Sequence, residues 1–188
     1  MEKTYTPPIG CYAPDFELPG IDDQVHHLAR YLDNFQAVGV VFMGNFCPDV
    51  RLYLKRLKQI QTDFEQQRFT LIGINANDAQ QIPEDSFDAM KSFAAQENLN
   101  FPYLRDHNQD VAKCFRAKII PEAFLIDNKA ILCYRGRIDD CADSPDSVQT
   151  PYLRNSIAAL LNGQPVATNV TEAVGCNLKW RTKPRYLE

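Results

Sequence analysis

An apolar run from Val38 to Phe42 is followed, five residues later, by Cys47, a proline and a long periodic helix. An unbroken apolar run of this kind is typical of a strand that is buried on both faces of a sheet. The helix is expected from Pro48 to about Gln66, because its apolar residues recur at intervals of three and four. Proline suits the first helical position, where its missing N–H leaves no hydrogen bond unmade. The pattern therefore predicts a central sheet with crossover helices.

The remaining elements complete this architecture. The sequence predicts an edge strand near Phe16, one helical turn from His27 to Tyr31 and a second buried strand at 69–74. Further helices are expected at 86–96, 110–116 and 150–161. A short extended piece is expected at 98–104, and a hairpin of two strands at 123–126 and 131–136. A βαβ half followed by a ββα half predicts the α/β class, with a thioredoxin-like fold whose central mixed sheet is flanked by helices. We expect one domain at 1–165, and a C-terminal tail at 166–188 that packs on it.

Composition excludes several classes of protein. Hydrophobic residues make up 45% of the chain and charged residues 23%, which is ordinary for a globular protein, and the net charge of -4 argues against electrostatic binding of nucleic acid. There is no apolar stretch of about 20 residues and no apolar leader at the N-terminus, so we expect no membrane span and a cytoplasmic location. The six cysteines are widely and irregularly spaced, and no pair has zinc-ligand spacing. We therefore expect no metal site and no bound cofactor.

Cys47 is the strongest candidate for chemistry. At a strand-to-helix junction its sulfur lies near the free N–H groups and the positive end of the helix dipole, which favour the reactive thiolate. Arg51, one helical turn further on, is a candidate to stabilise that thiolate by its charge, whereas Asp49 opposes it. Position 44 is a glycine, so the motif reads G-x-x-C and not C-x-x-C.

Several segments resemble thioredoxin-like redoxins, the alkyl hydroperoxide reductase and thiol-specific antioxidant (peroxiredoxin-like) family. One branch of that family carries C-N-x-C-P after its first core strand. The matching segments keep the same order along the chain and lie at 13–18 (APDFEL), 45–48 (NFCP), 83–90 (PEDSFDAM), 101–106 (FPYLRD), 120–124 (IPEAF), 134–140 (YRGRIDD) and 175–180 (GCNLKW).

The resemblance implies the thioredoxin fold and a cis bond at Ile120–Pro121 that places Pro121 opposite Cys47. It also implies that Cys176 in the tail is the best candidate to resolve an oxidised Cys47. Peroxiredoxins use an arginine on the strand after the hairpin turn to polarise the peroxide, and Arg135 is the candidate for that role here. The chain departs from the family pattern because Gly44 stands at the position of the first cysteine of the C-x-x-C motif.

The resemblance further implies a thiol-based antioxidant oxidoreductase, in which Cys47 reduces a hydroperoxide through a sulfenate. An external reductant, either a small thiol or a thioredoxin-like protein, then restores the thiols. Two alternatives remain open at this point. One is a monothiol disulfide reductase or isomerase, which acts on a disulfide substrate. The other is a degenerate, non-catalytic redoxin that only binds a partner. A pKa of the Cys47 thiol near the ordinary value of about 8.5 would favour this second alternative. The sequence leaves the physiological substrate and the oligomeric state open.

Overall fold

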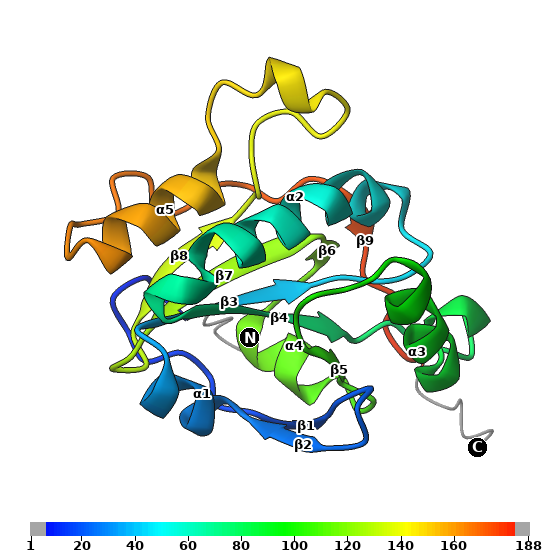
Figure 1. Cartoon of the computed structure of the whole chain (residues 1–188). Helices are drawn as coiled ribbons and strands as arrows, with labels where there is room; N and C mark the ends of the chain where they lie inside the picture. The colour runs from blue at the N-terminus through cyan, green and yellow to red at the C-terminus, as the bar shows by residue number, and fades with distance from the viewer. Residues whose placement is uncertain (1–6, 183–188) are drawn as a thin grey trace, which may run out of the picture.

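The fold is built on a five-stranded mixed sheet, seen here in a computed structural model that describes residues 7–182 (Figure 1). The strand order is β5 (Tyr103–Arg105), β4 (Phe69–Asn75), β3 (Ala37–Phe42), β7 (Glu122–Asp127) and β8 (Leu132–Gly136). β3, β4 and β5 are parallel, and β7 is antiparallel to both β3 and β8. Every residue of β3 and β4 is buried, as the apolar runs predicted. The predicted α/β thioredoxin-like fold is confirmed.

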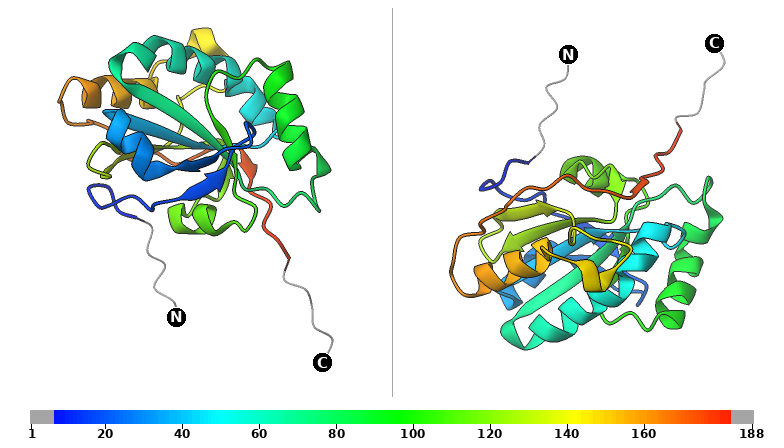
Figure 2. Two further views of the ribbon diagram at one scale, coloured as in Figure 1. Left: turned by 60° about the horizontal axis from the view of Figure 1, so that its bottom comes forward. Right: turned by 90° about the horizontal axis from the view of Figure 1, so that it is seen from above.

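Helices cover both faces of this sheet (Figures 1 and 2). On one face lie α2 (Pro48–Phe64) and α5 (Tyr152–Leu161), with α3 (Phe87–Gln96) packed beside α2. α4 (Asp110–Phe115) packs on the opposite face, where the ring centroid of Phe115 lies 5.6 Å from that of Phe42 and 5.1 Å from that of Phe124. The apolar stripe of α2 faces the sheet and is buried, which explains why this amphipathic segment folds as a helix.

The N-terminal segment forms a hairpin of β1 (Glu17–Pro19) and β2 (Val25–His27), followed by α1 (Leu28–Asn34). Two more short strands, β6 (Ile119–Ile120) and β9 (Cys176–Asn177), pair antiparallel with each other. The sequence did not predict β2, β6 or β9, because their two or three residues show no alternation of apolar and polar side chains. The β6–β9 pair ties the C-terminal segment to the residues beside Pro121.

Candidate active site

Cys47 lies at the carboxyl edge of the sheet, where the chain leaves β3 and enters α2. It is the N-cap residue of α2, with extended backbone angles of φ -74° and ψ 119°, and Pro48 occupies the first helical turn. Its side chain makes no capping hydrogen bond to the first N–H groups of the helix. Only 5% of the residue is exposed. The strand and helix therefore fix this sulfur in the wall of the core rather than on a mobile loop.

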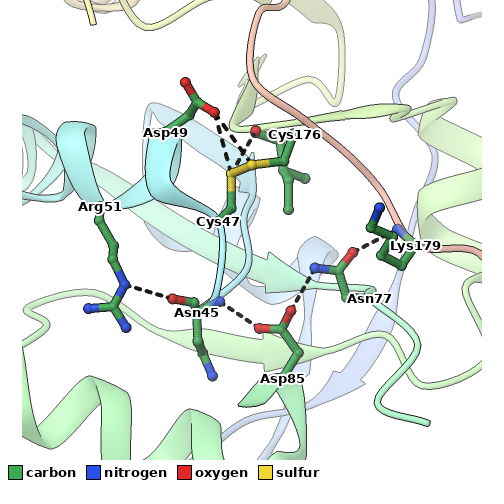
Figure 3. The surroundings of a disulfide bond; sticks show 9 residues. Asn45, Cys47, Asp49, Arg51, Asn77, Asp85, Cys176 and Lys179 are labelled. Atoms are coloured by element: carbon green, nitrogen blue, oxygen red, sulfur yellow. Dashed lines mark hydrogen bonds between the residues drawn. A yellow bond between two sulfur atoms is a disulfide. The ribbon is translucent and has the colours of Figure 1, made fainter. Parts of the chain in front are cut away.

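A disulfide bond joins Cys47 to Cys176, and its surroundings are drawn in Figure 3. The two residues are 129 positions apart, and their Cα atoms lie 6.1 Å apart. Cys176 is half-buried, so it is the more exposed residue of the pair. The structure thus brings together the two cysteines that the sequence singled out. Cys11 and Cys114 are exposed free thiols, and Cys133 and Cys141 are half-buried ones.

The segment that carries Cys176 is held on both sides of the cysteine. Before it, Val170 forms a parallel bridge to Arg135 of β8. After it, the buried Leu178 donates its N–H to the Lys118 carbonyl at 2.8 Å. Gly175 has φ +154°, and a Cβ there would collide with the carbonyl oxygen of Ile120. Cys176 is consequently placed by the fold as well as by the disulfide.

A buried polar network lies beneath the entry to α2 (Figure 3). The carboxylate of Asp85, which is fully buried, accepts hydrogen bonds from the Asn45 N–H at 2.6 Å, the Asn75 amide at 2.9 Å and the Asn77 amide at 2.7 Å. The carbonyl oxygen of the Asn77 side chain accepts a further bond from the N–H of Lys179 at 2.8 Å. Asp85 and Asn77 therefore link the turn before Cys47 to the segment after Cys176.

Two more buried side chains complete the network. Tyr103 donates its hydroxyl to the Asn45 side-chain oxygen at 2.9 Å, and burial raises the pKa of Tyr103 well above its ordinary value. Arg105 donates to the backbone carbonyls of Asp85 at 3.0 Å and Asn77 at 2.7 Å. Burial lowers the pKa of Arg105, although the nearby Asp85 carboxylate partly offsets this shift. A buried network whose members all have partners holds one geometry of the loops around it.

Gly44 borders the same network. A Cβ at this position would lie 2.6 Å from the Asn77 amide nitrogen, 3.1 Å from an Asp85 carboxylate oxygen and 3.1 Å from a methyl carbon of Ile120. The first distance is shorter than any ordinary contact, so something would have to move for a side chain to fit. The space three residues before Cys47 is thus filled by polar groups from other parts of the chain.

Asp49 stands beside the two sulfurs (Figure 3). Its Oδ2 atom lies 3.4 Å from the sulfur of Cys176 and 3.9 Å from that of Cys47. Within residues 7–182 its carboxylate makes no hydrogen bond or ion pair with any other group. A carboxylate this close to a thiol disfavours the thiolate but can accept its proton.

Pro121 follows a cis peptide bond from Ile120, as the resemblance implied. The carbonyl oxygen of Ile120 lies 3.4 Å from the sulfur of Cys47, so this segment forms one wall of the site. Ile120 itself pairs with Cys176 in the β6–β9 ladder. The segment before Pro121 therefore contacts both halves of the disulfide.

The two candidate arginines do not meet the sulfurs. Arg51 points away from them and donates its Nε–H to the Asn45 carbonyl at 3.0 Å (Figure 3). Its guanidinium lies over the Phe93 ring and 3.7 Å from the Glu97 carboxylate. Arg135 lines a cleft of about 710 Å³ on the α4 side of β8, and the described residues that line it include neither cysteine. The roles assigned to Arg51 and Arg135 stay predictions.

The same cleft contains Glu122, the residue after Pro121. Burial raises the pKa of Glu122 from 4.5 to about 7, although the nearby charges of Arg135 and Lys118 act in the opposite direction. Glu122 therefore changes charge near neutral pH.

Sequence reasoning missed the network residues Asn75, Asn77 and Asp85. One signal was present, because Asn75 is the last residue of the buried strand β4 and Asn77 follows it, at the sheet edge where Cys47 follows β3. Polar residues at the carboxyl ends of neighbouring parallel strands gather at one edge, where sites of α/β proteins usually lie.

Across residues 7–182, no helix has the length and apolar character needed to cross a membrane.

Comparison with known proteins places this geometry in a family context. Residues 9–135 match the sequence model of the AhpC/TSA family, which covers more than half of the chain. The matched segment contains Cys47 and Pro121, while Cys176 lies beyond it.

Three known proteins resemble this chain in sequence or in structure. A crystal structure of a hypothetical protein from Sinorhizobium meliloti superposes with a TM-score of 0.88 at 33% identity, covering 95% of this chain and 98% of the other. The thiol-disulfide oxidoreductase ResA of Geobacillus thermodenitrificans is 24% identical over 119 residues, which is 63% of each chain, so the match spans less than two thirds of that relative's length. Peroxidoxin BcpB of Mycobacterium tuberculosis shares the fold, with a TM-score of 0.64 at 19% identity over 82% of this chain and 96% of the other.

Proposed function

We propose that this chain, which belongs to the AhpC/TSA family, reduces hydroperoxides with Cys47 and Cys176 as its working pair of thiols. The observation that carries this proposal is the disulfide between the N-cap cysteine of α2 and the cysteine of β9. Two sulfurs held together by the fold form and break a disulfide without a large rearrangement. The position of Cys47 at a helix N-terminus favours the thiolate that such chemistry needs.

The cycle begins on the reduced protein. The thiolate of Cys47 attacks the terminal oxygen of a hydroperoxide, the O–O bond breaks, and the products are a Cys47 sulfenic acid and an alcohol, whose proton comes from solvent. Because Cys47 is only 5% exposed, its own substrate is expected to be small. Neither Gly44 nor a guanidinium at the sulfur assists this step, so we expect it to be slower than in peroxidases that have such groups.

Resolution uses Cys176. Its sulfur attacks the sulfenic sulfur, a disulfide forms, and the hydroxyl leaves as water. Asp49, at 3.4 Å from the Cys176 sulfur, is placed to accept the thiol proton and pass it to the departing hydroxyl. Two equivalents of an external thiol then reduce the disulfide and leave as their own disulfide.

The test uses fully reduced protein, a small hydroperoxide and intact-mass analysis. The wild type is expected to lose two hydrogens as the Cys47–Cys176 disulfide forms. Cys176→Ser is expected to gain one oxygen at Cys47 that a sulfenate-specific reagent traps, and Cys47→Ser to give neither product. Cys114→Ser, an exposed free cysteine, is the matched control and should behave as the wild type. Equal peroxide consumption by Cys47→Ser and wild type would rule the proposal out.

A second candidate is thiol–disulfide exchange with another protein. It is favoured by the greater accessibility of Cys176 and by Phe46, which is 58% exposed beside Cys47 and offers an apolar surface to a partner. In that case the reduced chain donates the electrons. The thiolate of Cys176 attacks the disulfide of the other protein and releases one of its thiols, and Cys47 then attacks the mixed disulfide and releases the second thiol as the Cys47–Cys176 disulfide forms. Insulin reduction measured against peroxide consumption separates the two activities, and the absence of both would leave a redoxin that only binds.

A further inference from the structure

Three atoms at the site form a donor set for a metal ion. These are the Sγ atoms of Cys47 and Cys176 and a carboxylate oxygen of Asp49, all within 4.8 Å of one another (Figure 3). Two thiolates and a carboxylate are ligands that Zn²⁺ accepts, whereas Mg²⁺ and Ca²⁺ prefer oxygen alone. We propose that the reduced form of this chain binds one Zn²⁺ ion through Cys47, Cys176 and Asp49.

The distances from Asp49 fit a tetrahedral ion. With Zn–S bonds of about 2.3 Å and Zn–O bonds of about 2.0 Å, a tetrahedron separates a sulfur and an oxygen ligand by about 3.5 Å. The Asp49 oxygen already lies 3.4 Å from the sulfur of Cys176 and 3.9 Å from that of Cys47. Reduction removes the covalent bond between the sulfurs, and the ion takes its place between them. Three protein ligands leave the fourth position open to water.

The fold keeps these ligands in place after reduction. Cys47 and Asp49 belong to the first turn of α2, and Cys176 is held by the β6–β9 ladder. On the C-terminal side of Cys176, the Lys179 N–H donates to the side-chain oxygen of Asn77 at 2.8 Å. A site whose ligands are already ordered loses little conformational entropy when the ion binds.

The charge of the site also favours a cation. The carboxylate of Asp49 lies beside both sulfurs and makes no ion pair with a cation in residues 7–182. A divalent cation attracts this carboxylate and both thiolates at once. The low exposure of Cys47 strengthens these interactions.

Metal binding and disulfide formation exclude each other, since both use the same sulfurs. A hydroperoxide that oxidises the loaded form takes two electrons from the two thiolates and two protons from solvent. The products are the disulfide, an alcohol, one water and free Zn²⁺. This inference rests on the proposed function only in taking Cys47 and Cys176 as a reversible redox pair.

The binding test uses the full chain, reduced with a phosphine, freed of reductant and titrated with Co²⁺ under anaerobic conditions. Reduced wild type is expected to bind one Co²⁺ with thiolate-to-cobalt charge-transfer absorption and the intense visible bands of a tetrahedral ion, and one Zn²⁺ should displace it. Disulfide-bonded protein should show neither. Cys176→Ser should weaken binding at least about 100-fold, and Asp49→Asn at least about 10-fold, while the latter keeps the charge-transfer band.

Asp88→Asn, an exposed carboxylate on α3, and Cys114→Ser are matched controls that should bind as the wild type. If the Asp49→Asn variant binds as tightly as wild type, or the disulfide form binds equally well, the inference is overturned. The titration contains no peroxide, so its failure leaves the peroxidase proposal standing. A peroxidase assay without turnover, conversely, leaves the metal site standing.

Discussion

Two regions flank Cys47, and they differ in what they offer its sulfur. On the side of position 44 lies a polar network, in which Asn77 and Asp85 occupy the space that a side chain at Gly44 would need. On the opposite side lies the tail segment, which supplies the sulfur of Cys176. The first region is three residues away in sequence and carries no redox group. The second is 129 residues away and carries the partner.

This difference shows how one polar side chain serves both regions. Asn77 fills the space at Gly44 with its amide nitrogen and anchors Lys179 of the tail with its amide oxygen. A local partner at position 44 and the present anchoring of the tail thus compete for the same volume. The predictions below separate the two regions by perturbing each in turn.

The largest effect is expected from Asp85→Ala. The substitution removes a buried acceptor and leaves three buried donors, on Asn45, Asn75 and Asn77, without their partner. Stranding buried donors in this way should lower the free energy of unfolding by about 3–5 kcal/mol. Denaturant titration of the disulfide-bonded protein measures it. Glu84→Ala, an exposed neighbour, should stay within about 0.5 kcal/mol of wild type, and a similar value for Asp85→Ala would show that the network does not hold the turn.

A smaller effect is expected at the glycine itself. Gly44→Ala places a Cβ 2.6 Å from the Asn77 amide, and overpacking of this kind should cost about 1–3 kcal/mol. Because Asn77 is the obstacle, Asn77→Ala should relieve part of that cost. The loss of unfolding free energy in the double variant should therefore be about 1 kcal/mol smaller than the sum of the losses in the two single variants.

A double-mutant cycle in denaturant measures this coupling. Gln81→Ala is the matched control, since Gln81 also donates to the tail, at the Trp180 carbonyl, but does not approach Gly44. Its effect should add to that of Gly44→Ala within about 0.5 kcal/mol. Additive behaviour of the Asn77 pair would mean that the two regions are not linked through this side chain.

Sequence reasoning reached the two regions unequally. The junction at Cys47 was predicted because a buried strand and an amphipathic helix each leave a periodic pattern. Cys176 was indicated only by a family resemblance, since nothing near it in the sequence shows which strand it pairs with. The contacts of Asn77 and Asp85 were not predicted, because they depend on how separate loops meet at one sheet edge. Asp49 was noticed only as a charge opposed to the thiolate, and its place beside both sulfurs required the tertiary structure.

The tail side is expected to respond to pH through Glu122, which follows Pro121. Burial raises its pKa from 4.5 to about 7, so the folded protein holds this proton more tightly than the unfolded chain does. Stability should therefore fall as pH rises from about 4.5 to about 7, by on the order of 1–3 kcal/mol, and level off above that range. Glu122→Gln should remove this slope and be more stable than wild type at pH 8.

Unfolding curves at several pH values test this expectation. Glu172→Gln, an exposed residue that lines the same cleft, is the control and should keep the wild-type slope. If wild type and Glu122→Gln lose stability in parallel between pH 4.5 and 7, the pH dependence of stability comes from a group other than Glu122.

The smallest effect is expected from Arg51→Ala, which tests whether this arginine assists Cys47 directly. Its guanidinium donates to the Asn45 carbonyl and faces Glu97, and its side chain is 54% exposed. Solvent therefore screens the interaction between its charge and the Cys47 sulfur. The rate of Cys47 alkylation in reduced Cys176→Ser protein should fall by about two- to fivefold, in line with an exposed charge. Lys55→Ala, exposed one turn further along α2, should leave the rate unchanged. A loss of tenfold or more would instead mean that Arg51 turns toward the thiolate once the disulfide is open, and that its charge then acts directly on the sulfur.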